Sequence, residues 1–119
     1  MVPKKSGPLP EKLELYEKLV ATNPKVERKG DTKPYTSLNG NMFSRLDPSG
    51  VLSLRLPEGE REKFLTKYKT KLFESYGIVQ KEYVTVPDSL LKNTKQLQKH
   101  FEMSYNYAAT LKAKPTKKG

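Results

Sequence analysis

The single histidine, His100, is the side chain of this chain best suited to acid–base chemistry near neutral pH. It lies in the segment LQKHFEM, where a helical pattern places it next to Phe101 and on a side that also carries lysines. One histidine cannot form a catalytic triad or a multi-histidine metal site, although an imidazole paired with a carboxylate or with Tyr83 would serve a small enzyme. Its setting favours a half-exposed structural histidine, and catalysis through His100 stays an alternative.

Other reactive groups are missing or scattered. The chain has no cysteine, which excludes disulfides, thiolate nucleophiles and cysteine-based zinc or iron–sulfur sites. The glycine-containing segment NGNMFSRLDPSG has neither GxxxxGK[ST] nor GxGxxG, so it does not match a phosphate-binding loop. The sequence therefore predicts no catalytic residue, no cofactor-binding residue, no metal ligand and no cofactor, and it favours a protein that is not an enzyme.

The net charge of +10 invites a polyanion-binding interpretation, but much of the excess lies at the chain ends. Residues 1–9 carry Lys4 and Lys5 without an acid, and we expect them to form a flexible basic tail. Residues 112–119 form a second expected flexible tail, rich in lysine and proline. Weak, non-specific polyanion contacts are predicted for its lysines: Lys112, Lys114, Lys117 and Lys118.

Aromatic residues are numerous for a thin core, with seven tyrosines and four phenylalanines. Exposed aromatics near Arg45, Arg55, Lys81 and Lys99 would suit stacking on single-stranded bases. They would equally suit a dimer surface, where tyrosine, phenylalanine and arginine are enriched. Ordinary packing is the leading interpretation.

Between the tails, the pattern of apolar residues predicts one domain over residues 10–111. A helix is expected over 10–21, because Leu13, Tyr16 and Leu19 recur at helical spacing. A weak strand is expected over 26–29 and a second over 35–38.

A hairpin is the clearest feature of the middle of the chain. Apolar residues alternate with polar ones over 42–46 and over 51–56, which is typical of strands with one buried face. Between the two arms, Asp47-Pro48-Ser49-Gly50 matches a type I turn, and Gly50 is expected to adopt positive φ and form a bulge. Polar and aromatic residues beside this hairpin form the predicted binding surface: Tyr35, Asn39, Asn41 and Arg45.

The second half predicts a helix over 58–67, a strand within 80–86, a short helix over 88–91 and a long final helix capped by Thr94. The order helix, strands, helix, strand, helix favours a two-layer α+β fold. It would contain an antiparallel sheet of four or five strands with helices on one face. No segment matches a membrane span or a signal peptide, so the expected location is the cytoplasm.

The chain resembles the TfoX N-terminal domain family, whose best-known member regulates natural competence in bacteria. The resemblance covers residues 13–114 and rests on NGNMFSRLDPSGVLSLRLPE, FESYGIVQKEYVTVPDSLL and YNYAATLKAKPTKKG, the last being similar to small stand-alone members. It implies an α+β fold with an antiparallel sheet and little about chemistry. Ser44 and Arg45 follow Phe43 here, where the family usually has paired glycines.

Together these features predict a non-enzymatic binding or adaptor domain that acts through protein contacts, with a homodimer and a regulatory role as further expectations. The first alternative is non-specific nucleic-acid binding through the basic tails and an aromatic, basic face. The second alternative is a small enzyme that uses His100 with a carboxylate or a tyrosine.

Overall fold

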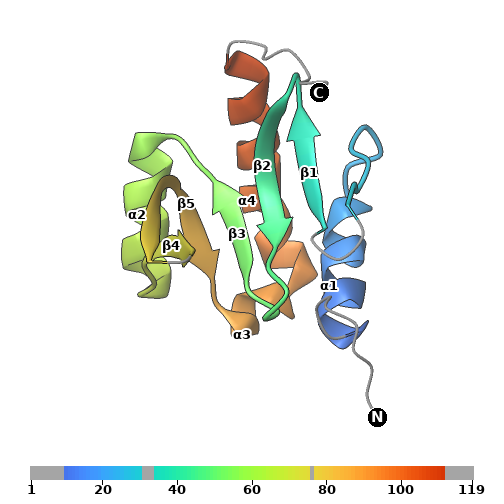
Figure 1. Cartoon of the computed structure of the whole chain (residues 1–119), viewed down its shortest axis with the longest axis horizontal. Helices are drawn as coiled ribbons and strands as arrows, with labels where there is room; N and C mark the ends of the chain where they lie inside the picture. The colour runs from blue at the N-terminus through green and yellow to red at the C-terminus, as the bar shows by residue number, and fades with distance from the viewer. Residues whose placement is uncertain (1–9, 31–33, 76, 112–119) are drawn as a thin grey trace.

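The computed structural model describes residues 10–30, 34–75 and 77–111, which form an α+β structure (Figure 1). The predicted two-layer α+β class with an antiparallel sheet is confirmed, and the sheet has five strands. In chain order the elements are α1 (Pro10–Val20), β1 (Tyr35–Leu38), β2 (Asn41–Leu46), β3 (Leu52–Arg55), α2 (Glu58–Tyr68), β4 (Leu72–Ser75), β5 (Ile78–Val86), α3 (Asp88–Leu91) and α4 (Thr94–Thr110).

The strands lie in the order β1-β2-β3-β5-β4, and every neighbouring pair is antiparallel. In the centre of the sheet, Leu54 pairs with Ser44 on one side and with Val84 on the other. The strand predicted over 26–29 is wrong, since only Lys29 forms an isolated bridge, to Tyr35. Strand β4 had no counterpart in the sequence prediction.

The turn between β2 and β3 has the predicted chemistry. The amide of Gly50 donates to the carbonyl of Asp47 at 2.7 Å, and the amide of Asp47 donates to the carbonyl of Val51 at 2.8 Å. Gly50 has a φ of 92°, which a residue with a side chain rarely adopts. The hydroxyl of Ser49 donates to the Asp47 carboxylate at 2.6 Å. The segment therefore turns the chain, as its sequence predicted.

Strand β2 departs from the strict alternation that its sequence suggests. The register with β1 shifts between Thr36 and Ser37, which marks a β-bulge. Both Phe43 and Ser44 consequently face helices. The ring of Phe43 lies 5.7 Å from that of Phe101 in α4, and the hydroxyl of Ser44 lies 2.6 Å from the Tyr16 hydroxyl in α1.

The core lies between the sheet and the helices α1, α2, α3 and α4, and α4 packs on β2 and β3 (Figure 1). Asn93 precedes α4 as its N-cap, and its side-chain oxygen accepts from the amide of Gln96. The predicted cap at Thr94 is therefore wrong by one residue. The largest fully buried side chains are Tyr16, Phe43, Phe64, Phe101, Leu19, Leu46, Leu52, Leu54, Leu56, Leu91, Leu97 and Val84.

Candidate functional site

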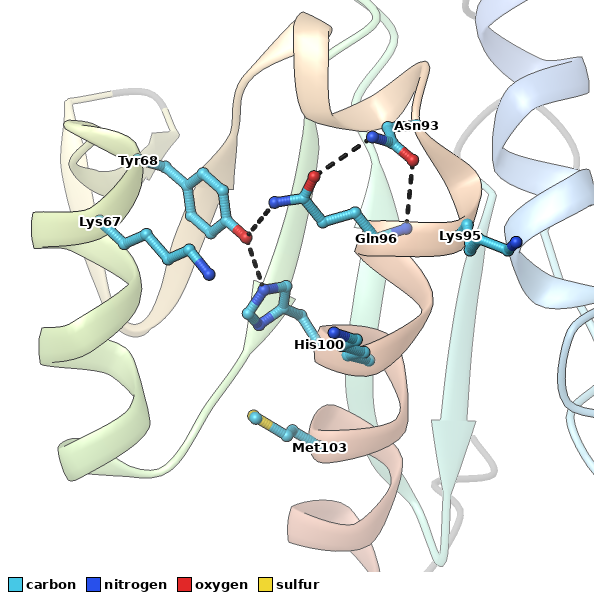
Figure 2. Close-up of a pocket in the computed structure, with 8 residues that line it drawn as sticks. Lys67, Tyr68, Asn93, Lys95, Gln96, His100 and Met103 are labelled. Carbon is cyan, nitrogen blue, oxygen red and sulfur yellow. Dashed lines mark hydrogen bonds between the residues drawn. The ribbon is translucent and has the colours of Figure 1, made fainter.

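A pocket of about 530 Å³ opens between the last turn of α2 and the first turns of α4 (Figure 2). Lys67 and Tyr68 line it from α2, and Asn93 lies at its edge, just before α4. The volume lies within the range of small-molecule and side-chain binding sites. We call it the α2–α4 pocket, and α4 lines it with Lys95, Gln96, Lys99, His100 and Met103.

Helix geometry explains why these α4 residues share one wall. Gln96 and His100 are four residues apart and Met103 follows three residues later, a spacing that places all three on one helix face. On the facing helix, Tyr68 is the last residue of α2, which ends as Lys69 adopts a left-handed conformation with φ of 51°. The two helix ends thus bring the side chains together.

A chain of hydrogen bonds connects the polar groups of this wall (Figure 2). The side-chain nitrogen Nδ2 of Asn93 donates to the side-chain oxygen Oε1 of Gln96 at 3.2 Å. Gln96 Nε2 donates to the hydroxyl oxygen of Tyr68 at 3.0 Å, and that hydroxyl lies 2.9 Å from Nε2 of His100. The two helices are therefore joined by polar contacts at the pocket.

The donor and the acceptor can be assigned for the hydrogen bonds that connect Asn93, Gln96 and Tyr68. Asn93 Oδ1 accepts from the backbone amide of Gln96, which fixes Asn93 Nδ2 as the donor to Gln96 Oε1 and leaves Gln96 Nε2 to face Tyr68. The phenolic oxygen of Tyr68 accepts from Gln96. In its hydrogen bond with His100 Nε2, the phenol donates when the imidazole proton is on Nδ1, and the imidazole donates when that proton is on Nε2.

Rings pack behind the polar wall. The ring of Phe64 lies 4.7 Å from that of Tyr68 and 5.0 Å from that of His100, the latter edge-on. Phe64 is itself 2% exposed and belongs to the core. The positions of Tyr68 and His100 are thus fixed by packing as well as by hydrogen bonds.

The charged side chains that line the α2–α4 pocket are all positive. Lys67, Lys95 and Lys99 are exposed, and none of the described lining residues is an acid. Burial lowers the pKa of His100, and repulsion from Lys67 and Lys99 lowers it further, while Glu60 opposes the shift. At neutral pH the imidazole is uncharged, and the positive charge of the pocket comes from the lysines.

A second polar cluster lies where α4 meets β5. Arg55 Nε donates to Glu82 at 2.7 Å, and the hydroxyl of Tyr107 donates to the other Glu82 oxygen at 3.3 Å. The guanidinium of Arg55 also lies 5.7 Å from the centre of the Tyr83 ring. Because the two charges satisfy each other, this cluster holds elements together and leaves no net charge for a ligand.

The binding surface predicted from the sequence is only partly assembled. Tyr35 and Arg45 are directly paired across β1 and β2, and Arg45 lies 3.9 Å from Asp47. Asn39 is exposed in the turn between these strands, with a φ of 55°. Asn41 is 2% exposed, and its amide donates to the Asn39 carbonyl at 3.3 Å. Asn41 therefore cannot present its side chain to a partner, and its assignment to the surface is corrected.

The sequence singled out His100 but not the residues around it. Tyr83, named as a tyrosine partner, instead donates to the carbonyl of Met42 at 2.7 Å, and Tyr68 occupies the place beside His100. The helical spacing of Gln96 and His100 was a signal for their shared face, whereas Tyr68 comes from a different helix. The predicted polyanion contacts Lys112, Lys114, Lys117 and Lys118 lie outside the described residues.

Two further properties concern the described part of the chain. Over residues 10–30, 34–75 and 77–111, no group of three or more histidines or acids is arranged to hold a metal ion. In the same ranges, no helix is both long and apolar enough to cross a membrane. Comparison with known proteins gives no match to a family model, to a curated protein or to a solved structure.

Proposed function

We propose that this protein is a non-catalytic binding domain that engages an anionic segment of a partner protein through the α2–α4 pocket. One observation carries the proposal: the exposed lysines Lys67, Lys95 and Lys99 line a pocket whose described lining residues include no acid. Opposite charge on a partner would therefore be attracted to this site and oriented by it.

The wall of the pocket supports binding more than catalysis. Tyr68, Gln96 and His100 are hydrogen-bonded to one another, so they form a fixed polar surface. Met103 adds an apolar group that the stem of a bound side chain would contact. The resemblance to TfoX N-terminal domains, a family linked to regulation, also supports a binding role for this chain.

The proposal is tested by fluorescence anisotropy with a labelled glutamate-rich peptide. The double variant Lys67→Gln/Lys99→Gln removes two pocket charges, and we expect it to weaken binding roughly twofold to thirtyfold, because exposed ion pairs contribute about 0.2–1 kcal/mol each. The control Lys18→Gln/Lys25→Gln makes the same change of net charge at exposed positions that do not line the pocket. Equal loss in both variants, or no binding by the wild type, would contradict the proposed function.

A further inference from the structure

We propose that the group recognised in the α2–α4 pocket is a phosphate monoester carried by a side chain of the partner, as in a phosphoserine peptide. This inference rests on the proposed function and names its ligand chemistry. It is argued from the type of the cations, from their placement and from the polar chain that ends on His100.

The cations of the pocket are all lysines, and they come from two elements. Lys67 lies on α2, while Lys95 and Lys99 lie one turn apart on α4. Lysine ammonium groups are compact point charges with rotatable donors, and they bind phosphate groups in this way in many proteins.

The amount of positive charge also favours phosphate over a carboxylate. The described residues contain no ion pair of Lys67, Lys95 or Lys99 with an acid, so their charges are not neutralised within that part of the chain. A phosphate monoester carries nearly two negative charges at pH 7, whereas a glutamate carries one. A dianion therefore gains more than a monoanion from the lysines that line the pocket.

His100 gives the site a measurable response to a bound anion, and this response is larger for a dianion than for a monoanion. The imidazole is hydrogen-bonded to Tyr68 and lies edge-on to Phe64, both from α2. The charged groups that act on it are Lys67 and Glu60 of α2 and Lys99 of its own helix. In the doubly protonated form, His100 Nε2 donates to the Tyr68 oxygen, and the Tyr68 hydroxyl hydrogen is then available to a ligand. A dianion nearby favours this charged form and therefore raises the pKa of His100 on binding.

The experiment uses the full chain and three degenerate peptide libraries that differ only at the central residue, which is phosphoserine, glutamate or serine. We expect the phosphoserine library to bind about tenfold more tightly than the glutamate library, because a phosphate group accepts several charge-assisted hydrogen bonds at once. We expect Lys67→Gln/Lys99→Gln to abolish this preference and Lys18→Gln/Lys25→Gln to retain it.

A second readout follows the imidazole of His100 by NMR during a pH titration. Without ligand, its pKa is expected below 6.5. With the phosphoserine library bound, we expect it to rise by about half a pH unit or more. A His100→Gln variant assigns the signal, since the chain has one histidine.

The outcomes separate the two proposals. Equal binding of the glutamate and phosphoserine libraries overturns the phosphate inference and leaves the proposed function standing. Binding of neither library overturns both. A single-stranded oligonucleotide that binds more tightly than any peptide, and loses affinity in Lys67→Gln/Lys99→Gln, would assign the pocket to nucleic acid and overturn the peptide ligand.

Discussion

At the scale of single residues, His100 shows how far side-chain type can be read as chemistry. Its intermediate exposure agrees with the half-exposed histidine predicted from the sequence. Its tyrosine partner could not be predicted, because Tyr68 is separated from it by 32 residues and meets it only when α2 and α4 come together. A single histidine in a sequence thus indicates a possible proton donor or acceptor, and the fold determines which side chain hydrogen-bonds to it.

Glu82 allows a pH-dependent prediction at the same scale. Partial burial favours its protonated form, but the hydrogen bond and charge of Arg55 outweigh this effect and lower the pKa of Glu82 below 4.5. A carboxylate with a depressed pKa stabilises the folded state above its unfolded pKa, and this contribution is lost as pH falls through the folded pKa. The side chain is 38% exposed, so we expect a contribution of less than about 1 kcal/mol.

Glu82→Gln is therefore expected to lower the free energy of unfolding at pH 7 and to have a smaller effect at pH 3, because protonation of wild-type Glu82 increases as the pH falls toward its lowered pKa. Urea unfolding at both pH values measures the difference. Glu14→Gln, at an exposed position of α1, is the control for the loss of one negative charge. A Glu82→Gln effect of the same size at pH 3 and pH 7 would show that packing, and not the ion pair, is responsible.

At the scale of elements, local chemistry explains which predictions were correct. The β2–β3 turn follows from Asp47, Pro48 and Gly50, whose preferences act within four residues. Strand β4 was missed because its pairing is irregular: Leu72 pairs with Val84, but Glu74 already pairs with Val79. Strand β4 forms because β5 offers a pairing partner. Its four residues are too few to show an alternating apolar pattern from which a strand could be predicted.

Asn93 links an element boundary to the site. Its oxygen caps α4 at the amide of Gln96, and its nitrogen holds the Gln96 side chain toward Tyr68. Asn93→Ala removes both contacts, so we expect the free energy of unfolding to fall by about 1 kcal/mol and binding to the α2–α4 pocket to weaken. Thermal unfolding and peptide anisotropy measure the two effects.

The conservative variant Asn93→Ser separates these roles. Serine is a good N-cap but has no amide to donate to Gln96, so stability should be kept while pocket binding still weakens. If Asn93→Ser loses neither stability nor binding, the contact from Asn93 to Gln96 has no part in shaping the pocket.

At the scale of the whole molecule, the class of fold was predictable and the site was not. The order of helices and strands, together with short hairpins, is sufficient to favour an antiparallel sheet covered by helices. The α2–α4 pocket depends on tertiary placement, since Lys67 and Lys99 are far apart in sequence and become neighbours only across two packed helices. The β2 bulge is a similar case, because it turns Phe43 and Ser44 toward helices at opposite ends of the chain.

The distribution of charge over the whole chain gives the last prediction. Residues 1–9 and 112–119 hold six lysines and no acid, and the sequence predicts them to be flexible tails. Removing both segments should therefore leave the thermal unfolding midpoint nearly unchanged. It should also reduce affinity for a single-stranded oligonucleotide, because binding of this kind follows the number of cations that contact phosphates, with a slope of about −0.7 in log K per contact and unit of log salt.

Peptide binding should respond differently to the same deletion. If the α2–α4 pocket holds the peptide, residues 10–111 keep both their affinity for it and its dependence on Lys67 and Lys99, while the salt slope for the oligonucleotide becomes shallower. Anisotropy titrations at about 50 to 300 mM salt measure the affinity of the peptide and of the oligonucleotide before and after the deletion. Polyanion binding weakens strongly on the order of this salt range. An unchanged oligonucleotide slope after deletion would instead place the nucleic-acid contacts on the folded body, and the basic ends would have no part in them.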